Sequence, residues 1–171
     1  MIRIEAEMIA LCRSQPQTCS PAAAKFIGII ETARTRSGRA RAGEVNRAVN
    51  LAIRPLSDQA QFGVPDFWAS PLVTFASGAG DCEDYAIAKY VALREAGMAA
   101  SDSRLIVLRD RREPGNHAGA AARVDGQWLM LDNRRMIMMT DVDANVSALY
   151  ALGDDEENLA PVFASAGQPD A

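Results

Sequence analysis

The stretch GAGDCEDYAIAKYVALREAG, residues 78–97, contains the start, the body and the end of one amphipathic helix. Asp81 stands at the N-cap position and Gly97 stands where a helix normally ends. The apolar positions follow helical spacing and are Ala86, Tyr90, Val91, Leu93 and Ala96. The stretch therefore predicts a helix that begins at Cys82, which is either a nucleophile or a small buried hydrophobic residue.

Three carboxylates lie next to this cysteine in the sequence, those of Asp81, Glu83 and Asp84. Each nearby negative charge disfavours a thiolate. The N-terminal end of a helix has the opposite effect, because its dipole and its free N–H groups favour negative charge. A reactive Cys82 therefore needs something that offsets its acidic neighbours.

Two more helices are predicted upstream of this stretch. Ser20 and Pro21 form an N-cap and a first turn ahead of the apolar pattern of residues 22–34. Residues 43–54 carry a second helical stripe, which Pro55 ends. The arginines between these helices are expected to form a solvated linker, with anion binding as the alternative, and are Arg34, Arg36, Arg39 and Arg41.

The segment FGVPDFWASPLVTFASGAG, residues 62–80, connects these helices to the cysteine. Pro65 and Pro71 interrupt it and glycines close it, so we expect irregular structure. Its aromatic anchors are expected to be Phe62, Phe67 and Trp68.

After residue 100 the pattern changes from helix to strand. Residues 103–110, SRLIVLRD, are a short apolar run rich in β-formers. Asp125-Gly126 is a two-residue hairpin signal that joins the predicted strands 117–124 and 127–131. Helices followed by antiparallel strands indicate an α+β domain.

Composition and charge limit the class of protein. The 171 residues are 49% hydrophobic and 23% charged, which suits one soluble domain, expected over residues 1–153 with an acidic tail at 154–171. A net charge of −4 argues against nucleic acid as the main partner. No apolar run is long enough to span a bilayer. The first twelve residues do not form a signal peptide, so the protein is either cytoplasmic or preceded by a removed leader.

The chain has three cysteines, Cys12, Cys19 and Cys82. The first two flank a proline-containing, loop-like stretch, so they either form a short disulfide or are two unrelated thiols. If they pair, Cys82 is the one free thiol.

Catalysis by a thiol needs a base and a group that orients the base. His117 is the single histidine and starts the first hairpin strand, whereas Asp132 follows the second. The open ends of a hairpin lie side by side, which predicts that His117 and Asp132 are cross-strand neighbours. If the helix start packs against them, Cys82 completes a triad. The alternative is a buried cysteine, a structural histidine and a turn aspartate.

These motifs resemble the bacterial transglutaminase-like cysteine peptidases, whose best-known members are periplasmic proteases that process surface adhesins. The resemblance rests on GDCEDYAIAKYVALREAG, NHA and WLMLDN, with DFWASPLVTF ahead of the cysteine. It implies a papain/transglutaminase-like α+β fold, with N-terminal helices and the nucleophile helix packed on an antiparallel β-sheet. It also implies that Cys82 is the nucleophile, His117 the general base and acid, and Asp132 the orienting group.

The same resemblance implies a calcium site (Ca2+) beside the cysteine. Its acidic ligands match Asp81 and Glu83, with Asp84 as a further candidate. Calcium takes about 6–8 oxygen ligands, so other groups must complete the shell. A bound cation would offset the acids that disfavour the thiolate. Export to the periplasm, with the leader absent from this sequence, and a regulatory membrane receptor are also implied.

The strand that follows His117 departs from the family pattern. The family has bulkier β-formers where this chain has AGAAARV, residues 118–124. We therefore expect a thin strand of little core weight that alters the substrate groove.

The leading interpretation is a cysteine endopeptidase that hydrolyses a protein substrate, which the resemblance suggests is a cell-surface adhesin. The alternatives are an acyl transferase of the transglutaminase type, with the same triad, and a non-catalytic calcium-binding interaction module. Arginines on loops beside the site are expected at the solvated surface, with an acidic substrate segment as the alternative partner, and are Arg109, Arg111, Arg112, Arg134 and Arg135.

Overall fold

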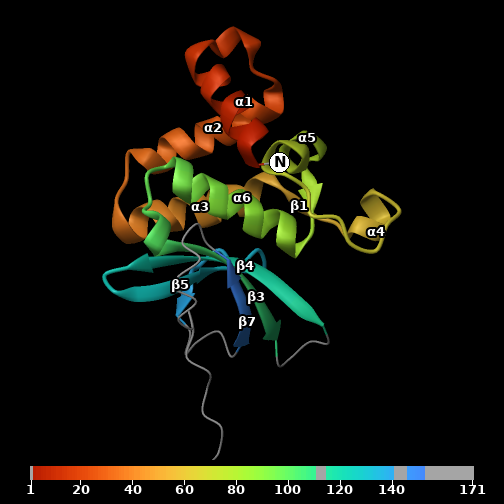
Figure 1. Cartoon of the computed structure of the whole chain (residues 1–171), viewed down its shortest axis with the longest axis vertical. Coiled ribbons are helices and arrows are strands. Elements are labelled where there is room, and N and C mark those ends of the chain that lie inside the picture. The colour runs from red at the N-terminus through yellow and green to blue at the C-terminus, as the bar shows by residue number, and fades with distance from the viewer. Residues whose placement is uncertain (1, 111–114, 141–145, 153–171) are drawn as a thin grey trace, which may run out of the picture.

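A layer of helices covers one face of an antiparallel sheet in the computed structural model, which describes residues 2–110, 115–140 and 146–152 (Figure 1). Its helices are α1 (Ile2–Ser14), α2 (Pro21–Arg34), α3 (Gly38–Ala52), α4 (Asp58–Gln61), α5 (Pro71–Ser77) and α6 (Cys82–Glu95), with short 3-10 turns η1 (Pro16–Thr18) and η2 (Ala100–Asp102). Its strands are β1 (Arg54–Pro55), β2 (Ala79–Gly80), β3 (Ser103–Asp110), β4 (Asn116–Val124), β5 (Gln127–Leu131), β6 (Met139–Thr140) and β7 (Val146–Leu152). The expected α+β class is confirmed.

Two sequence-based expectations concern other features of the whole chain. The acidic tail predicted at 154–171 lies outside the described residues. Among the helices that the structure does describe, none has the length and apolarity needed to cross a bilayer.

Helix α2 starts as its sequence predicts. The Ser20 hydroxyl accepts a hydrogen bond from the Ala23 N–H at 3.1 Å, which satisfies one of the free donors at the helix start. One face of α2 buries Phe26, Ile30 and Ala33. The Phe26 ring packs 4.9 Å from the Phe75 ring, so α2 and α5 share the helical core.

The predicted arginine linker is largely helical, so the expectation of a linker was wrong, although Arg34, Arg36 and Arg39 are exposed as expected. Helix α3 begins at Gly38 rather than Gly43, because arginine and alanine at 39–42 are strong helix formers. Arg34 and Arg41 donate to the backbone carbonyls of Glu95 and Gly97 at 2.6 and 3.1 Å. These arginines therefore bind the C-terminal end of α6.

The segment 62–80 is only partly irregular. Residues 71–77 form α5, which has a proline in its first turn and buries Phe75. The expected aromatic anchors are not buried, since Phe62, Phe67 and Trp68 are 37%, 43% and 41% exposed. Phe62 and Phe67 instead pack on each other, with ring centroids 4.8 Å apart.

The sheet has the order β6-β5-β4-β3-β7. Strands β4 and β5 meet at the predicted turn, where Asp125 and Gly126 have φ angles of 53° and 79°. Both values lie in the left-handed region that a two-residue hairpin turn requires. Strand β4 is thus the central strand, next to β3 and β5.

Strand β4 is not marginal to the core, and the expectation of little core weight was wrong. Its residues 118–122 are all buried. Ala120 and Ala122 face the helical core, whereas Ala118 packs beside Cys82. Because these side chains are short, α6 lies directly on the strand. The small residues therefore bring the start of α6 and the start of β4 together.

Candidate active site

Cys82 is the first residue of α6 and lies against β4. Its thiol donates to Glu83 Oε2 at 2.9 Å and also receives a hydrogen bond from the backbone N–H of Ala118. The pKa of the thiol is raised to about 12, mainly by burial and also by the hydrogen bond to Glu83, whereas the Ala118 N–H lowers it. In this arrangement the acids hold Cys82 as a thiol, which is the electrostatic conflict seen in the sequence.

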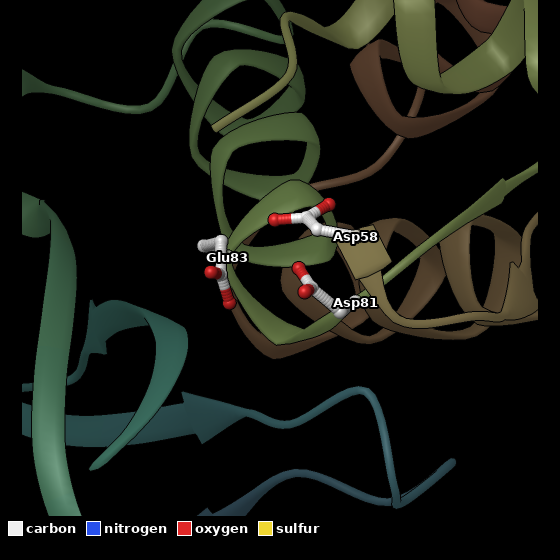
Figure 2. Close-up of side chains that lie close together, drawn as sticks. All are labelled: Asp58, Asp81 and Glu83. Atoms are coloured by element: carbon white, nitrogen blue, oxygen red, sulfur yellow. The ribbon is translucent and has the colours of Figure 1, made fainter. Parts of the chain in front are cut away.

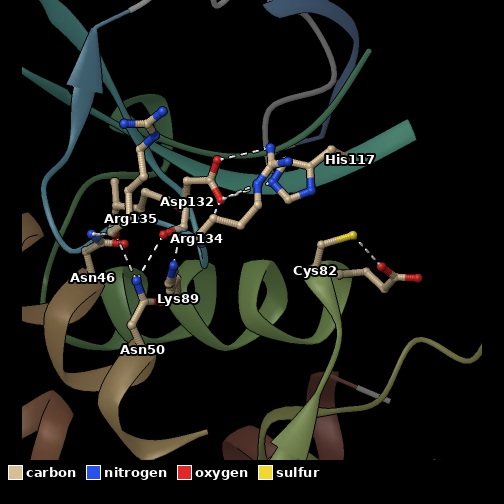
Figure 3. Close-up of polar contacts among 10 residues, drawn as sticks. Asn46, Asn50, Cys82, Lys89, His117, Asp132, Arg134 and Arg135 are labelled. Atoms are coloured by element: carbon tan, nitrogen blue, oxygen red, sulfur yellow. Dashed lines mark hydrogen bonds and ion pairs between the residues drawn. The ribbon is translucent and has the colours of Figure 1, made fainter. Parts of the chain in front are cut away.

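His117 and Asp132 meet across the open end of the hairpin, as predicted. The distance from His117 Nε2 to Asp132 Oδ1 is 3.1 Å, and the two residues are 8% and 2% exposed. An ionised carboxylate can only accept, so Nε2 carries the proton and Nδ1 keeps its lone pair. Figure 3 shows the Cys82 side chain rising from α6 toward the side of β4 that carries His117.

Arg134 completes the surroundings of Asp132. Its backbone N–H donates to Asp132 Oδ1 at 2.9 Å, and its guanidinium lies 3.4 Å from both carboxylate oxygens. Burial raises the pKa of Asp132, but the hydrogen bonds from His117 and the Arg134 N–H, with the positive charges of Arg134 and of His117 when it is protonated, outweigh burial and hold that pKa far below its usual range. Asp132 is therefore ionised and held in place on two sides.

This depressed pKa gives Asp132 a stabilising contribution that depends on acid. The contribution is complete above the unfolded pKa of about 4 and is lost as the pH falls toward the lower folded value. We expect the difference in unfolding free energy between wild type and Asp132→Asn to shrink as the pH falls from 5 to 2, measured by urea denaturation. The exposed Asp66→Asn variant is the control, and an Asp132 difference that stays constant would contradict the expectation.

The arginines expected beside the site do not all lie in the described residues. Arg111 and Arg112 fall outside them, and Arg109 is an exposed residue of β3. Arg134 contacts the Asp132 carboxylate, a role that the sequence did not suggest. Arg135 is exposed, and its backbone carbonyl accepts a hydrogen bond from Asn50 of α3.

Three carboxylates gather around the start of α6, two of them from the residues on either side of Cys82. Figure 2 shows that these side chains lie close together. Asp58, Asp81 and Glu83 each offer an oxygen, and these oxygens lie within 4.8 Å of one another. The pKa of Asp81 is raised to about 8, mainly by burial and also by the negative charges of Glu83 and Asp58. The sequence predicted two of the three residues, and it missed Asp58.

Asp84, the third candidate from the sequence, is not one of these three residues, although the charges of Asp58 and Glu83 act on its carboxyl group. It is fully buried, and its Oδ1 accepts from the Ala69 N–H at 2.8 Å. Burial raises its pKa to about 6, although the Ala69 N–H acts against that rise. A Cβ on Gly80 would lie 2.6 Å from Asp84 Oδ2, so only glycine leaves room for this carboxylate. Asp84 therefore fixes the backbone ahead of Cys82, through its hydrogen bond with Ala69 and its close contact with Gly80.

Solved structures of LapG from Legionella pneumophila have the same fold. One matches with a TM-score of 0.71 and 18% identity over 88% of this chain and 84% of LapG. Calcium-bound LapG gives 0.72 and 18% over 85% and 84%, and EGTA-treated LapG gives 0.69 and 19% over 86% and 80%. No curated protein matches the sequence.

The sequence also matches a family model. The model, described as bacterial transglutaminase-like cysteine proteinase BTLCP, covers residues 4–149, which includes the whole site. This confirms the resemblance drawn from the motifs around Cys82, His117 and Asp132. The chain belongs to the bacterial transglutaminase-like cysteine proteinases and is a cysteine peptidase.

Proposed function

We propose that the chain is a calcium-dependent endopeptidase in which Cys82, His117 and Asp132 form the catalytic triad. The observation that carries the proposal is the buried contact between His117 and Asp132, at 3.1 Å, beside a helix-start thiol. The thiol is bound to the N–H of Ala118, the residue next to His117. A base and its orienting carboxylate are thus in contact, and a free thiol lies beside Ala118, the next residue of β4, which supports a triad at this point.

The chemistry follows from these positions. His117 Nδ1 accepts the proton of Cys82, and the sulfur attacks the carbonyl carbon of a peptide bond. Asp132 keeps the proton on Nε2 and stabilises the imidazolium that forms. His117 then protonates the leaving amine, which leaves a thioester on Cys82. Water, deprotonated by His117, hydrolyses the thioester, and the released acid and the free thiol complete the cycle.

The carboxylates beside Cys82 fit a divalent cation. Asp58 Oδ1 and Asp81 Oδ1 are buried and accept no hydrogen bond from the described part of the chain. Hard oxygen donors of this kind suit calcium. Asp58, Asp81 and Glu83 would hold the ion, and backbone carbonyls or waters would complete its shell. The ion would offset the negative charge beside the thiol. That LapG has been solved in a calcium-bound form supports this assignment.

The substrate class is a protein, as the family implies. A cell-surface adhesin as the target, and a membrane receptor as a regulator, rest on the resemblance to the adhesin-processing members alone. Product analysis tests the reaction type: the purified enzyme is incubated with a protein substrate, with and without an added primary amine. Two peptides with a free carboxylate support hydrolysis, whereas incorporation of the amine would show acyl transfer instead.

The proposed compartment is the periplasm, and the disulfide supports it. Cys12 and Cys19 are bridged, with Cα atoms 5.0 Å apart, and disulfides persist in oxidising compartments. Replacing both cysteines by alanine is expected to lower the unfolding free energy by about 2 kcal/mol, because the bridge closes a short loop of the unfolded chain. Urea denaturation with and without a reductant measures this. A reductant that destabilises the double variant as much as wild type would contradict it.

A further inference from the structure

The backbone that carries Asp132 is not held by the sheet. Strand β5 ends at Leu131, and the last pair of its ladder with β4 is Ala120↔Leu131. Asp132 is the next residue, and it begins a turn in which the Arg135 N–H approaches the Asp132 carbonyl at only 3.3 Å. His117 and Arg134 bind the Asp132 carboxylate itself, but the position of its backbone therefore depends on contacts from outside the sheet.

Two buried side chains of the helical layer supply these contacts (Figure 3). Asn50 of α3 donates through Nδ2 to the carbonyls of Asp132 and Arg135 at 3.0 and 2.9 Å. Lys89 of α6 donates through Nζ to the Leu131 carbonyl at 3.3 Å. The carbonyls of Asp132 and Leu131 thus both accept a hydrogen bond from the helical layer.

Lys89 also links the two halves of the site. It follows Cys82 by two helical turns, so both lie on the face of α6 that packs against the sheet. Lys89 is fully buried, with its ammonium group 5.7 Å from the centre of the Tyr85 ring. One rigid helix therefore presents the thiol at its start and supports the Asp132 backbone further along.

Neither side chain is explained well by stability. Burial lowers the pKa of Lys89 to about 7, against the effect of the Asp132 charge, so the buried amine is costly to the fold. Asn50 leaves its Oδ1 buried without a hydrogen bond from the described residues, as Asn46 also does, so what distinguishes Asn50 is its bond to the Asp132 carbonyl.

We propose that Asn50 and Lys89 are positioning residues of the peptidase, which orient the Asp132 carboxylate toward His117 by binding the backbone at Leu131 and Asp132. The inference rests on the triad proposed above. It assigns neither residue to the reacting atoms, since both act through Asp132.

The expected result is a loss of turnover without a loss of substrate binding. Asn50→Ala and Lys89→Met should each lower kcat about 10- to 100-fold and leave KM within about twofold, because a small misplacement of a catalytic group affects the transition state. Lys89→Met keeps the volume of the side chain and removes the donor. If Asn50→Ala does not fold, Asn50→Ser, which retains a shorter donor, takes its place.

The chain provides a matched control in Asn46. It is also a buried asparagine of α3, one helical turn before Asn50, but its Nδ2 donates to the carbonyls of Arg135 and Met136 at 2.9 and 3.2 Å. Within the described residues, Asn46 makes no hydrogen bond to the backbone of Leu131 or Asp132. Asn46→Ala should therefore lower stability about as much as Asn50→Ala and leave kcat near wild type. Equal losses of kcat would overturn the proposal.

A second readout does not depend on activity. His117 is the only histidine, so its imidazole N–H gives one NMR signal that reports the bond to Asp132. In Asn50→Ala and Lys89→Met this signal should shift toward its position in Asp132→Asn, and in Asn46→Ala it should not.

The two readouts separate this inference from the proposed function. If kcat falls while the His117 signal stays in place, the effect does not pass through Asp132 and the inference is overturned. The same holds if neither quantity changes. An active Cys82→Ala variant would overturn the triad instead, and the imidazole signal would still show whether Asn50 and Lys89 orient Asp132.

Discussion

Cys82→Ala is expected to abolish peptide hydrolysis, with kcat/KM falling by at least about 1,000-fold, because no thioester can form without the sulfur. The variant should fold as the wild type does, because Cys82 is only half-buried and the substitution removes a single atom beside Ala118. The measurement is cleavage of a protein substrate, with circular dichroism to confirm the fold.

The other two cysteines give the control. The Cys12→Ala/Cys19→Ala variant should keep its kcat at temperatures where it is folded, because the disulfide lies on the α1–α2 side and does not contact the site. Iodoacetamide should label Cys82 in wild-type protein and inactivate the enzyme. Retained hydrolysis in Cys82→Ala would refute the triad, and an inert Cys82 would favour the non-catalytic interaction module.

Removal of calcium is expected to have the second largest effect. In the structure the Cys82 thiol donates to Glu83, and Asp81, which lies in one carboxylate group with Asp58 and Glu83, also raises the pKa of the thiol. A chelator should therefore lower kcat/KM more than about tenfold, since each nearby unit charge shifts the thiol–thiolate balance by about one pKa unit or more. Added calcium should restore activity. It should also raise the melting temperature, because an ion that binds only the folded state stabilises it.

The Asp58→Asn variant tests whether calcium binds through this carboxylate group or through the net negative charge of the protein. Asp58 is buried, and one of its oxygens accepts from the Phe67 N–H at 2.5 Å while the other lacks a hydrogen bond within the described residues. The variant should bind calcium more than about tenfold more weakly in calorimetry, as expected when a charged ligand is lost. The exposed Asp66→Asn variant keeps the net charge change and should bind normally. Full activity in a chelator, with no change in melting temperature, would refute the calcium site.

Much of the fold was predictable because it depends on local chemistry. The helix from Cys82 to Glu95, the Ser20 cap and the Asp125-Gly126 turn each follow from residues that are adjacent in sequence. The contact between His117 and Asp132 was predictable for the same reason, since a two-residue turn fixes the register of the hairpin. Their catalytic roles remain proposals.

The wrong expectations concern places where packing overrides the local pattern. Prolines suggested an irregular segment at 62–80, yet a proline in the first turn is compatible with α5. Small residues suggested a marginal strand, yet β4 is central because the short side chains of Ala118, Ala120 and Ala122 let the helices approach. Propensity describes a segment alone, whereas burial depends on what packs against it.

The sequence by itself determined the helix that begins at Cys82, the hairpin and the pair of residues at its open ends. Only the tertiary structure brought Asp58 to the acids beside Cys82, and Asn50 and Lys89 to the backbone at Asp132. Short-range hydrogen bonds and periodicity leave a pattern in adjacent residues. A contact between α3 or α4 and a distant loop leaves none, because it is set by how the helices pack on one another and on β4.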